Sequence, residues 1–428
     1  MWHRLRGRWD TLPDPLPPTR RMTPRSRKGA STAKRALRWQ ALRLLDVWRR
    51  VRRTIRPRKR SARILLVASN GLMADYVLRV WDCISDLPGV RAYLTRFRGA
   101  TQGHDQLRQR LGVRWSMNGV SQLLDWDMLI LADHAPLSYP PSIPRVIVAH
   151  GVARSRLVRE GSYYYDRHRV FWPDGRPVYD VMFEASNKAR EWALTAVPEY
   201  SSRIRVVGDL RVDELLTHDR VRDEVRARLG WTDRCVVAVM STWSARALIP
   251  TQGEALLTVL SQLVDTGRYA VVLTMHPNLW AERRAGSQGW RQLVQSKAGE
   301  HFRVLQPDED WASWLPLTDL AVTDHTSLAA AYSVLRRPMI PVDAPLDAVG
   351  EGTFARWLLE TRARFSDPAE LPTLLEHAHV THANWRGIPA IVDYPGEARP
   401  RTRRVLLDVL ARTRDENAGG DNDSRGIV

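Results

Sequence analysis

Short apolar runs bounded by glycine and polar residues recur along most of the chain. They lack the polar/apolar alternation of half-exposed strands, which is typical of parallel strands covered on both faces. Runs of this kind predict strands at residues 64–68, 128–132, 145–148, 181–185, 204–207, 236–240, 269–275, 302–305, 320–323 and 339–342. Helical patterns lie between them, for example at 211–229 and 254–264.

The repeated order of strand and helix predicts an α/β protein with two Rossmann-like, doubly wound domains that face a central cleft. A length of 428 residues fits two such domains. The composition predicts a disordered basic arm at 1–33, a basic amphipathic helix at 34–60, an N-terminal domain at 61–222, a C-terminal domain at 223–412 and a disordered tail at 413–428.

The helix predicted at 34–60 has one apolar stripe, formed by Leu37, Ala41, Leu44, Trp48, Val51 and Ile55. Such a helix can lie in a membrane interface, with Trp48 at headgroup depth. The arginines that would then meet lipid phosphates are Arg49, Arg50, Arg52 and Arg53. Two other interpretations are open: the stripe packs on the protein body, or the helix belongs to an arm that binds nucleic acid.

Most of the positive charge lies at the N-terminus. Residues 1–60 hold 20 of the 65 Lys and Arg but 3 of the 47 Asp and Glu, which gives +17 of the net +18. A basic arm of this kind is expected to bind a polyanion, either nucleic acid or an anionic lipid surface. No run approaches the ~20 apolar residues that span a bilayer, and no signal peptide is recognised, so any membrane contact is expected to be peripheral. The two cysteines predict neither a disulfide framework nor a metal site, and favour a reducing compartment.

Two histidines stand directly after predicted strands. His150 and Gly151 follow the strand at 145–148, and His276 follows the strand at 269–275 and precedes a proline. Ligands in doubly wound sheets bind beyond the carboxyl ends of the strands, and imidazole transfers protons near neutral pH. Alternatively, each histidine only caps its strand or occupies a turn.

Polar side chains follow three further strands. Asp324, Thr326 and Ser327 end one strand and begin a helix, where free N–H groups favour a phosphate, although an ordinary N-cap has the same residues. Arg211 follows a glycine turn and can reach an anionic group or pair with Asp213. Two other candidates, Thr242 and Arg246, follow the first strand of the second set.

The order of these motifs resembles that of the CDP-glycerol glycerophosphotransferases, the teichoic-acid primases and polymerases of bacterial cell walls. The family's hallmarks are Trp-His-Gly, Gly-x-Pro-Arg-x-Asp, Pro-Thr-Trp-Arg, His-Pro and Thr-Asp-Tyr-Ser-Ser. The corresponding segments here are 149–151, 208–213, 241–244, 276–277 and 323–327, within a resemblance over about residues 63–390. This chain departs from the pattern at Ala149, Leu210, Ser244, Thr274 and His325.

The resemblance implies roles for these residues. His150 would take the proton from an acceptor hydroxyl, beside Gly151 on the acceptor side, and His276 would donate to the phosphate under attack. The N-terminal domain would hold the acceptor, and the C-terminal domain the nucleotide donor. Donor and phosphate contacts are expected from Asp324, Thr326, Ser327, Arg211, Thr242 and Arg246. The proton-transfer histidines match the family better than the donor contacts do.

The sequence therefore predicts a transferase that moves glycerol phosphate, or a related polyol phosphate, from a CDP-activated donor to a lipid-linked acceptor. It would work on the anionic inner face of the cell membrane, from the cytoplasmic side, without a cofactor or a nucleic-acid partner. The sequence shows no metal-ligand cluster and leaves metal dependence open. One rival is a glycosyltransferase of the same fold that uses a nucleotide sugar. A second is a non-enzymatic protein that binds nucleic acid through its basic arm.

Overall fold

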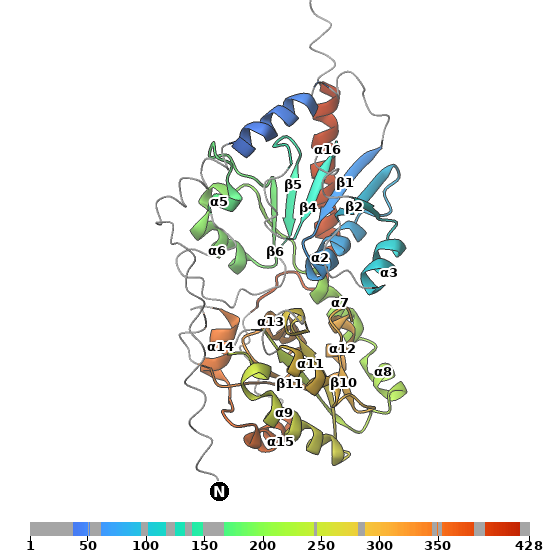
Figure 1. The fold of residues 1–428 in the computed structure, drawn as a ribbon, viewed down its shortest axis with the longest axis vertical. Coiled ribbons are helices and arrows are strands. Elements are labelled where there is room, and N and C mark those ends of the chain that lie inside the picture. The colour runs from blue at the N-terminus through green and yellow to red at the C-terminus, as the bar shows by residue number, and fades with distance from the viewer. Residues whose placement is uncertain are drawn as a thin grey trace, which may run out of the picture.

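The computed structural model describes residues 37–49, 51, 61–95, 102–116, 125–132, 139–148, 167–243, 246–280, 287–344, 349, 353–380 and 390–419. Two parallel sheets organise these residues into an N-terminal lobe and a C-terminal lobe (Figure 1). The fold predicted from the sequence, two doubly wound α/β units, is confirmed. The boundary predicted between the two domains, at residues 222 and 223, remains a prediction.

The sheet of the N-terminal lobe has seven parallel strands in the order β3-β2-β1-β4-β5-β6-β7. Their bounds are Ala62–Val67 (β1), Val90–Thr95 (β2), Arg114–Ser116 (β3), Met128–Leu131 (β4), Arg145–Val148 (β5), Val181–Glu184 (β6) and Ile204–Val206 (β7). Strands β2 and β3 are absent from the sequence prediction, because β2 carries charged and half-exposed positions and β3 is very short.

Helices cover both faces of this sheet. They are α2 (Gly71–Asp82), α3 (Gln102–Arg110), α5 (Arg167–Val170), α6 (Asn187–Ala196), the 3-10 turn η2 (Pro198–Tyr200) and, from the far end of the chain, α16 (Ala398–Gly419). Side-chain caps define where two of them begin: Asn70 accepts the Met73 N–H of α2 at 3.1 Å, and Ser186 accepts the Ala189 N–H of α6 at 3.2 Å.

The C-terminal lobe has five parallel strands in the order β10-β9-β8-β11-β12. Their bounds are Cys235–Ser241 (β8), Tyr269–Met275 (β9), Phe302–Val304 (β10), Leu320–Thr323 (β11) and Met339–Pro341 (β12). Its helices are α7 (Leu210–Asp219), α8 (Arg222–Arg228), α9 (Leu248–Asp265), α10 (Pro277–Trp280), α11 (Ser287–Gln295), α12 (Trp311–Trp314), α13 (Ser327–Tyr332), α14 (Phe354–Thr361) and α15 (Leu371–Val380). The 3-10 turns are η3 (Leu315–Leu317), η4 (Ser333–Leu335) and η6 (Pro368–Glu370).

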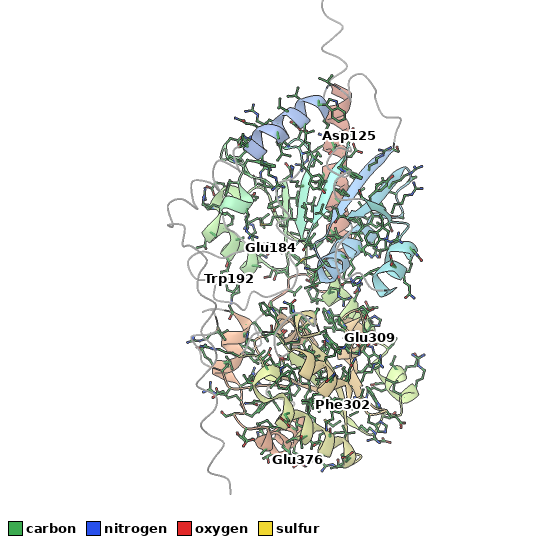
Figure 2. The ribbon with its side chains drawn as sticks, viewed as in Figure 1. Asp125, Glu184, Trp192, Phe302, Glu309 and Glu376 are labelled. Atoms are coloured by element: carbon green, nitrogen blue, oxygen red, sulfur yellow. The ribbon has the colours of Figure 1, made fainter. Side chains whose placement is uncertain are left out.

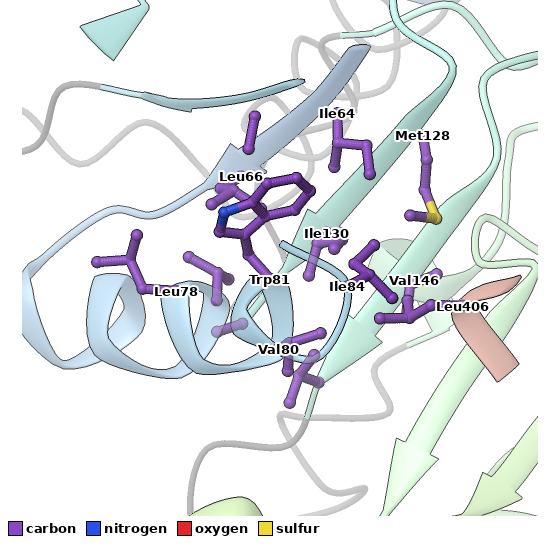
Figure 3. Packing of buried hydrophobic residues seen from close by; sticks show 14 of the residues in the cluster. Ile64, Leu66, Leu78, Val80, Trp81, Ile84, Met128, Ile130, Val146 and Leu406 are labelled. Atoms are coloured by element: carbon purple, nitrogen blue, oxygen red, sulfur yellow. The ribbon is translucent and has the colours of Figure 1, made fainter. Parts of the chain in front are cut away.

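The last helix returns to the first core. Leu406 of α16 belongs to the same buried cluster as Ile64 and Val146 of the N-terminal sheet, and Figure 3 shows these side chains in one packed layer. The chain therefore passes between the lobes twice, once before α7 and once before α16. Two sequence expectations need correction. The range predicted for the C-terminal domain includes this N-terminal-lobe helix, and the predicted disordered tail is helical as far as Gly419.

The N-terminal helix (residues 37–49) lies on the N-terminal lobe through the face opposite its predicted stripe. Leu42 is buried, and Trp39 stacks at 4.8 Å on Trp172. The stripe residue Leu44 is 72% exposed. The interpretation in which the stripe packs on the protein body is therefore wrong, because the body is contacted by the other side of the helix.

The assignment of Arg49 to a membrane surface is also wrong. Its side chain is 5% exposed, its Nε donates to Asp125 at 2.7 Å, and Nη2 donates to the Trp126 carbonyl at 2.8 Å. Asp46 accepts the Ser142 N–H beside this pair at 3.2 Å. Arg49 thus fixes the helix to the protein. Arg50, Arg52 and Arg53 lie outside the described residues.

Candidate active site

The carboxyl edges of the two sheets lie on the sides where the lobes meet. A Cβ added at Gly103, near the start of α3 in the N-terminal lobe, would come within 3.4 Å of the Asp308 carboxylate, which follows β10 in the C-terminal lobe. Figure 2 shows Asp125, which precedes β4, at the outer end of the N-terminal lobe, and Glu184, which ends β6, at the end toward the C-terminal lobe. Residues that follow strands in both lobes therefore occupy the region where this architecture binds ligands.

Ser241, at the end of β8, joins the ends of three neighbouring strands. Its carbonyl accepts the N–H of His276, which follows β9, at 2.9 Å. Its hydroxyl donates to Asp324, which follows β11, at 3.0 Å. Because β9 and β11 flank β8 in the sheet, three motifs far apart in sequence meet at one edge. The convergence expected of the second-lobe motifs is thus observed.

Asp324 is a positioning residue and not a donor contact. Its carboxylate is 3% exposed and accepts hydrogen bonds from the Ser241 hydroxyl, the Thr242 N–H at 3.0 Å and the Leu248 N–H at 2.9 Å. Burial raises the pKa of Asp324, against these hydrogen bonds and the nearby His325, which lower it. A carboxylate that faces into the protein and is engaged in this way offers nothing to an anionic phosphate, so the predicted role in donor binding is wrong.

His276 has the geometry of a hydrogen-bond donor. Its Nδ1 accepts the Asn278 N–H at 3.1 Å. An imidazole whose Nδ1 accepts carries its proton on Nε2. The Trp243 ring lies 6.1 Å from the His276 ring, between centroids, so the half-buried imidazole has an aromatic neighbour at the strand end. This tautomer suits donation to a phosphate oxygen.

The other second-lobe candidates differ in exposure. Thr326 is buried and caps α13, with its hydroxyl accepting the Leu328 N–H at 3.4 Å, as an ordinary N-cap would. Ser327 is exposed at the first position of that helix. Thr242 is half-buried and donates its N–H to Asp324, while Arg246 is exposed in the turn that precedes α9. Ser327, Thr242 and Arg246 thus lie in the segments that follow β11 and β8, and β8 carries the backbone partner of His276.

Arg211 lies elsewhere, between the lobes, and the predicted phosphate contact is wrong. Its guanidinium is 3% exposed and pairs with Asp310 at 2.7 Å, Glu214 at 2.9 Å and Asp75 at 3.6 Å. It also lies 4.5 Å over the Trp311 ring. Burial would lower the pKa of Arg211, but the surrounding carboxylates outweigh it and raise the pKa. The suggested pair with Asp213 does not form either, because Asp213 accepts backbone N–H groups instead.

His150 and Gly151 lie outside the described residues. The structure places the strand that leads to them: β5 ends at Val148, between β4 and β6, with its carboxyl end toward the C-terminal lobe. No group of three or more His, Cys, Asp or Glu side chains that could hold a metal ion occurs among the residues that the structure describes. In the same part of the chain, no helix is both long and apolar enough to span a bilayer.

Glu184 is a candidate that the sequence analysis missed. Its side chain is 2% exposed at the end of β6 and lines a small pocket with Gly208 and Asp209. The sequence signal was present, since an apolar run ends there at an acidic residue. His104 was also missed, and its Nε2 lies 3.1 Å from the Gly71 carbonyl at the start of α2. No apolar run precedes it to mark a strand end.

Comparison with known proteins finds a family match over part of the chain and a shared fold. The family described as CDP-Glycerol:Poly(glycerophosphate) glycerophosphotransferase matches residues 159–347. No curated protein sequence matches the chain. The wall teichoic acid polymerase TagF superposes with a TM-score of 0.59 at 14% identity, covering 90% of this chain and 98% of that one.

Two further solved structures share the fold. MnaA of S. aureus, solved with UDP, gives a TM-score of 0.52 at 12% identity over 81% of this chain and 95% of its own. The UDP-GlcNAc 2-epimerase of Methanocaldococcus jannaschii, in complex with UDP-GlcNAc and UDP, gives 0.51 at 14% identity over 81% and 99%. At these identities the structural likeness establishes the two-sheet fold.

Proposed function

We propose that this chain, which matches the CDP-glycerol glycerophosphotransferase family over residues 159–347, is a transferase that moves glycerol phosphate, or a related polyol phosphate, from a CDP-activated donor to an acceptor hydroxyl. The product is a teichoic-acid-like cell-surface polymer. The observation that carries the proposal is the meeting of the family's second-lobe motifs at one sheet edge, with His276 presenting a protonated Nε2.

The reaction breaks the phosphoanhydride bond of the donor and forms a phosphodiester bond to the acceptor. The acceptor hydroxyl oxygen attacks the phosphorus that bears glycerol, the bond between that phosphorus and the bridging oxygen breaks, and CMP leaves. The hydroxyl proton passes to His150. The Nε2–H of His276 donates to a phosphoryl oxygen as charge develops there. The residues that follow the strand ends, Thr242, Arg246 and Ser327, hold the donor. The phosphoanhydride supplies the activated bond, so the proposal requires no cofactor.

The test is a donor panel with purified protein and a lipid-linked saccharide acceptor. Incubation with labelled CDP-glycerol is expected to release CMP and to transfer the label to the acceptor, in equal amounts. UDP- and GDP-sugars serve as the comparison donors. Release of UDP or GDP, with no release of CMP, would contradict the proposal and favour a glycosyltransferase.

We also propose that the enzyme binds peripherally to the anionic inner face of the membrane, where its lipid-linked acceptor resides. The N-terminal helix supports this, because its outward face is apolar: Leu37, Leu44, Val47, Trp48 and Val51 are all at least 48% exposed. Exposed Arg38 and Arg43 lie on the same helix. An apolar face flanked by arginines fits an anionic lipid interface better than a nucleic acid, whose backbone offers no apolar partner.

The double substitution Leu44→Glu and Trp48→Glu is expected to lower partitioning onto anionic vesicles by about tenfold or more, since each side chain contributes about 1.5 kcal/mol or more when buried in an apolar phase. Vesicle co-sedimentation measures the effect, and activity on a soluble acceptor analogue is expected to persist. Val221→Glu is the matched control, because Val221 is an exposed apolar residue of the C-terminal lobe. Unchanged vesicle binding, or steeply salt-dependent DNA binding in its place, would refute the membrane role.

A further inference from the structure

The segment 208–213, which connects β7 to α7, does more than carry the chain from one lobe to the other. Arg211 of this segment was predicted to contact a ligand or to pair with Asp213. In the structure, Gly208, Arg211 and Asp213 instead contact the other lobe or the second crossing. The second crossing, residues 390–397, runs back to α16 and passes the same place.

Gly208 is where the two crossings touch. It adopts φ +83, and a Cβ there would lie 3.0 Å from the Asp393 carbonyl and 3.3 Å from the Ala398 Cβ. Both the left-handed backbone and this close approach require a residue without a side chain. Asp393 in turn accepts the Asn187 N–H at 2.8 Å, so the returning chain is held to the N-terminal lobe on its other side.

Asp213 ties the first crossing to the second. Its carboxylate accepts the Gly396 N–H at 2.6 Å and the Ala398 N–H at 2.7 Å. These are backbone donors at the start of α16, where a helix leaves N–H groups unsatisfied and favours a negative charge. A side chain of α7 in the C-terminal lobe therefore supplies the cap of the helix that packs in the N-terminal core.

Arg211 supplies the third link. It pairs with Asp310 and stacks on Trp311 of the C-terminal lobe, and it pairs with Asp75 of α2 in the N-terminal lobe. Arg79 of α2 reaches the same group, with Asp75 at 3.2 Å and Glu214 as partners. Two arginines thus face three carboxylates, so removing the Arg211 charge would leave one arginine for all three.

We infer that Arg211 and Asp213, with Gly208, are positioning residues that fix the angle between the two lobes, and so set the distance between the acceptor-side and donor-side groups. This goes beyond the proposed function and rests on it only for the kinetic part of the test. The donor contacts proposed above all follow strands of the C-terminal lobe, whereas His150 follows β5 of the N-terminal lobe. A change of lobe angle therefore alters the alignment of the reacting groups and leaves the donor site itself intact.

The experiment measures lobe geometry and kinetics on the same variants. Spin labels at Arg91→Cys in β2 and Ala255→Cys in α9, in a Cys235→Ser background, report the distance between the lobes. Arg211→Lys, which keeps the charge but loses the planar fork, and Asp213→Asn are each expected to shift or broaden that distance by several ångströms. We expect kcat to fall about 10²-fold with the donor KM unchanged, since small misalignments cost this much.

Arg268→Lys is the matched control, because Arg268 pairs with Glu376 on the surface of the C-terminal lobe alone. Gly208→Ala is a further variant that acts by steric displacement and not by charge, and it is expected to shift the distance in the same way. An unchanged distance distribution in Arg211→Lys and Asp213→Asn would overturn the inference. A rise in donor KM without a distance change would return Arg211 to the donor site. Because the distance is measured without substrate, it stands even if the donor proves not to be CDP-glycerol.

Discussion

Replacement of His276 by alanine is expected to lower kcat by about 10² to 10⁴-fold, the usual contribution of a side chain that donates to a group in the transition state. The imidazole lies at the joined ends of β8 and β9, and its Nε2 carries the proton that this role needs because Nδ1 accepts from the backbone at Asn278. The measurement is steady-state CMP release at saturating donor. Donor KM is expected to change much less than kcat, because the interaction forms mainly as charge develops on phosphorus.

The matched control is His218→Ala, in the last turn of α7 and away from the strand ends, which is expected to leave kcat unchanged. His150→Ala is expected to abolish turnover with the fold intact. Near-normal turnover in His276→Ala or His150→Ala would show that the role assigned to that residue in proton transfer or charge stabilisation is wrong.

Replacement of Asp324 by alanine is expected to lower the free energy of unfolding by about 3 kcal/mol or more. Its carboxylate accepts from the buried Leu248 N–H, the half-buried Thr242 N–H and the buried Ser241 hydroxyl, and each buried donor left without a partner costs about 1–3 kcal/mol. Chemical denaturation measures the loss. Activity should also fall, because the loop that carries Thr242 and Trp243 loses its anchor. Asp324→Asn keeps one accepting oxygen and is expected to lose less stability.

Asp367→Ala is the comparison for this variant. Asp367 also accepts a backbone N–H, from Ala369 at 2.9 Å, but on the surface, where the loss of a cap costs about 1 kcal/mol. If Asp324→Ala were as stable as the wild type and raised only the donor KM, the carboxylate would face the donor after all, and its assignment as a positioning residue would be wrong.

Most of the fold was predictable because buried parallel strands are recognisable in the sequence as short apolar runs. The residues from Val236 to Met240 are an example, and all five strands of the C-terminal sheet were found. The sequence did not predict β2 and β3. Both strands lie at the edge of the N-terminal sheet, where exposed positions such as Arg91 interrupt the apolar run. The packing of α16 on the N-terminal core could not be predicted from the sequence either. The apolar stripe of a helix does not indicate which of the two sheets it covers.

The candidate site was predictable in position but not in orientation. A polar residue that follows a strand looks the same in the sequence whether it faces a ligand or the protein. Asp324 and Arg211 face the protein, and only their burial and their partners reveal it. The N-terminal helix shows the same limit: its apolar stripe was recognised, but the second face, on which Leu42 and Arg49 contact the body, was not.

The most direct test of the account is the structure of the protein in complex with CDP-glycerol. We predict that the donor's phosphates lie within hydrogen-bonding distance of His276 Nε2, beside Thr242 and Ser327 at the ends of β8, β9 and β11. A nucleotide bound instead in the pocket of about 590 Å³ that Asn187 and Arg336 help to line, with the strand ends empty, would contradict it.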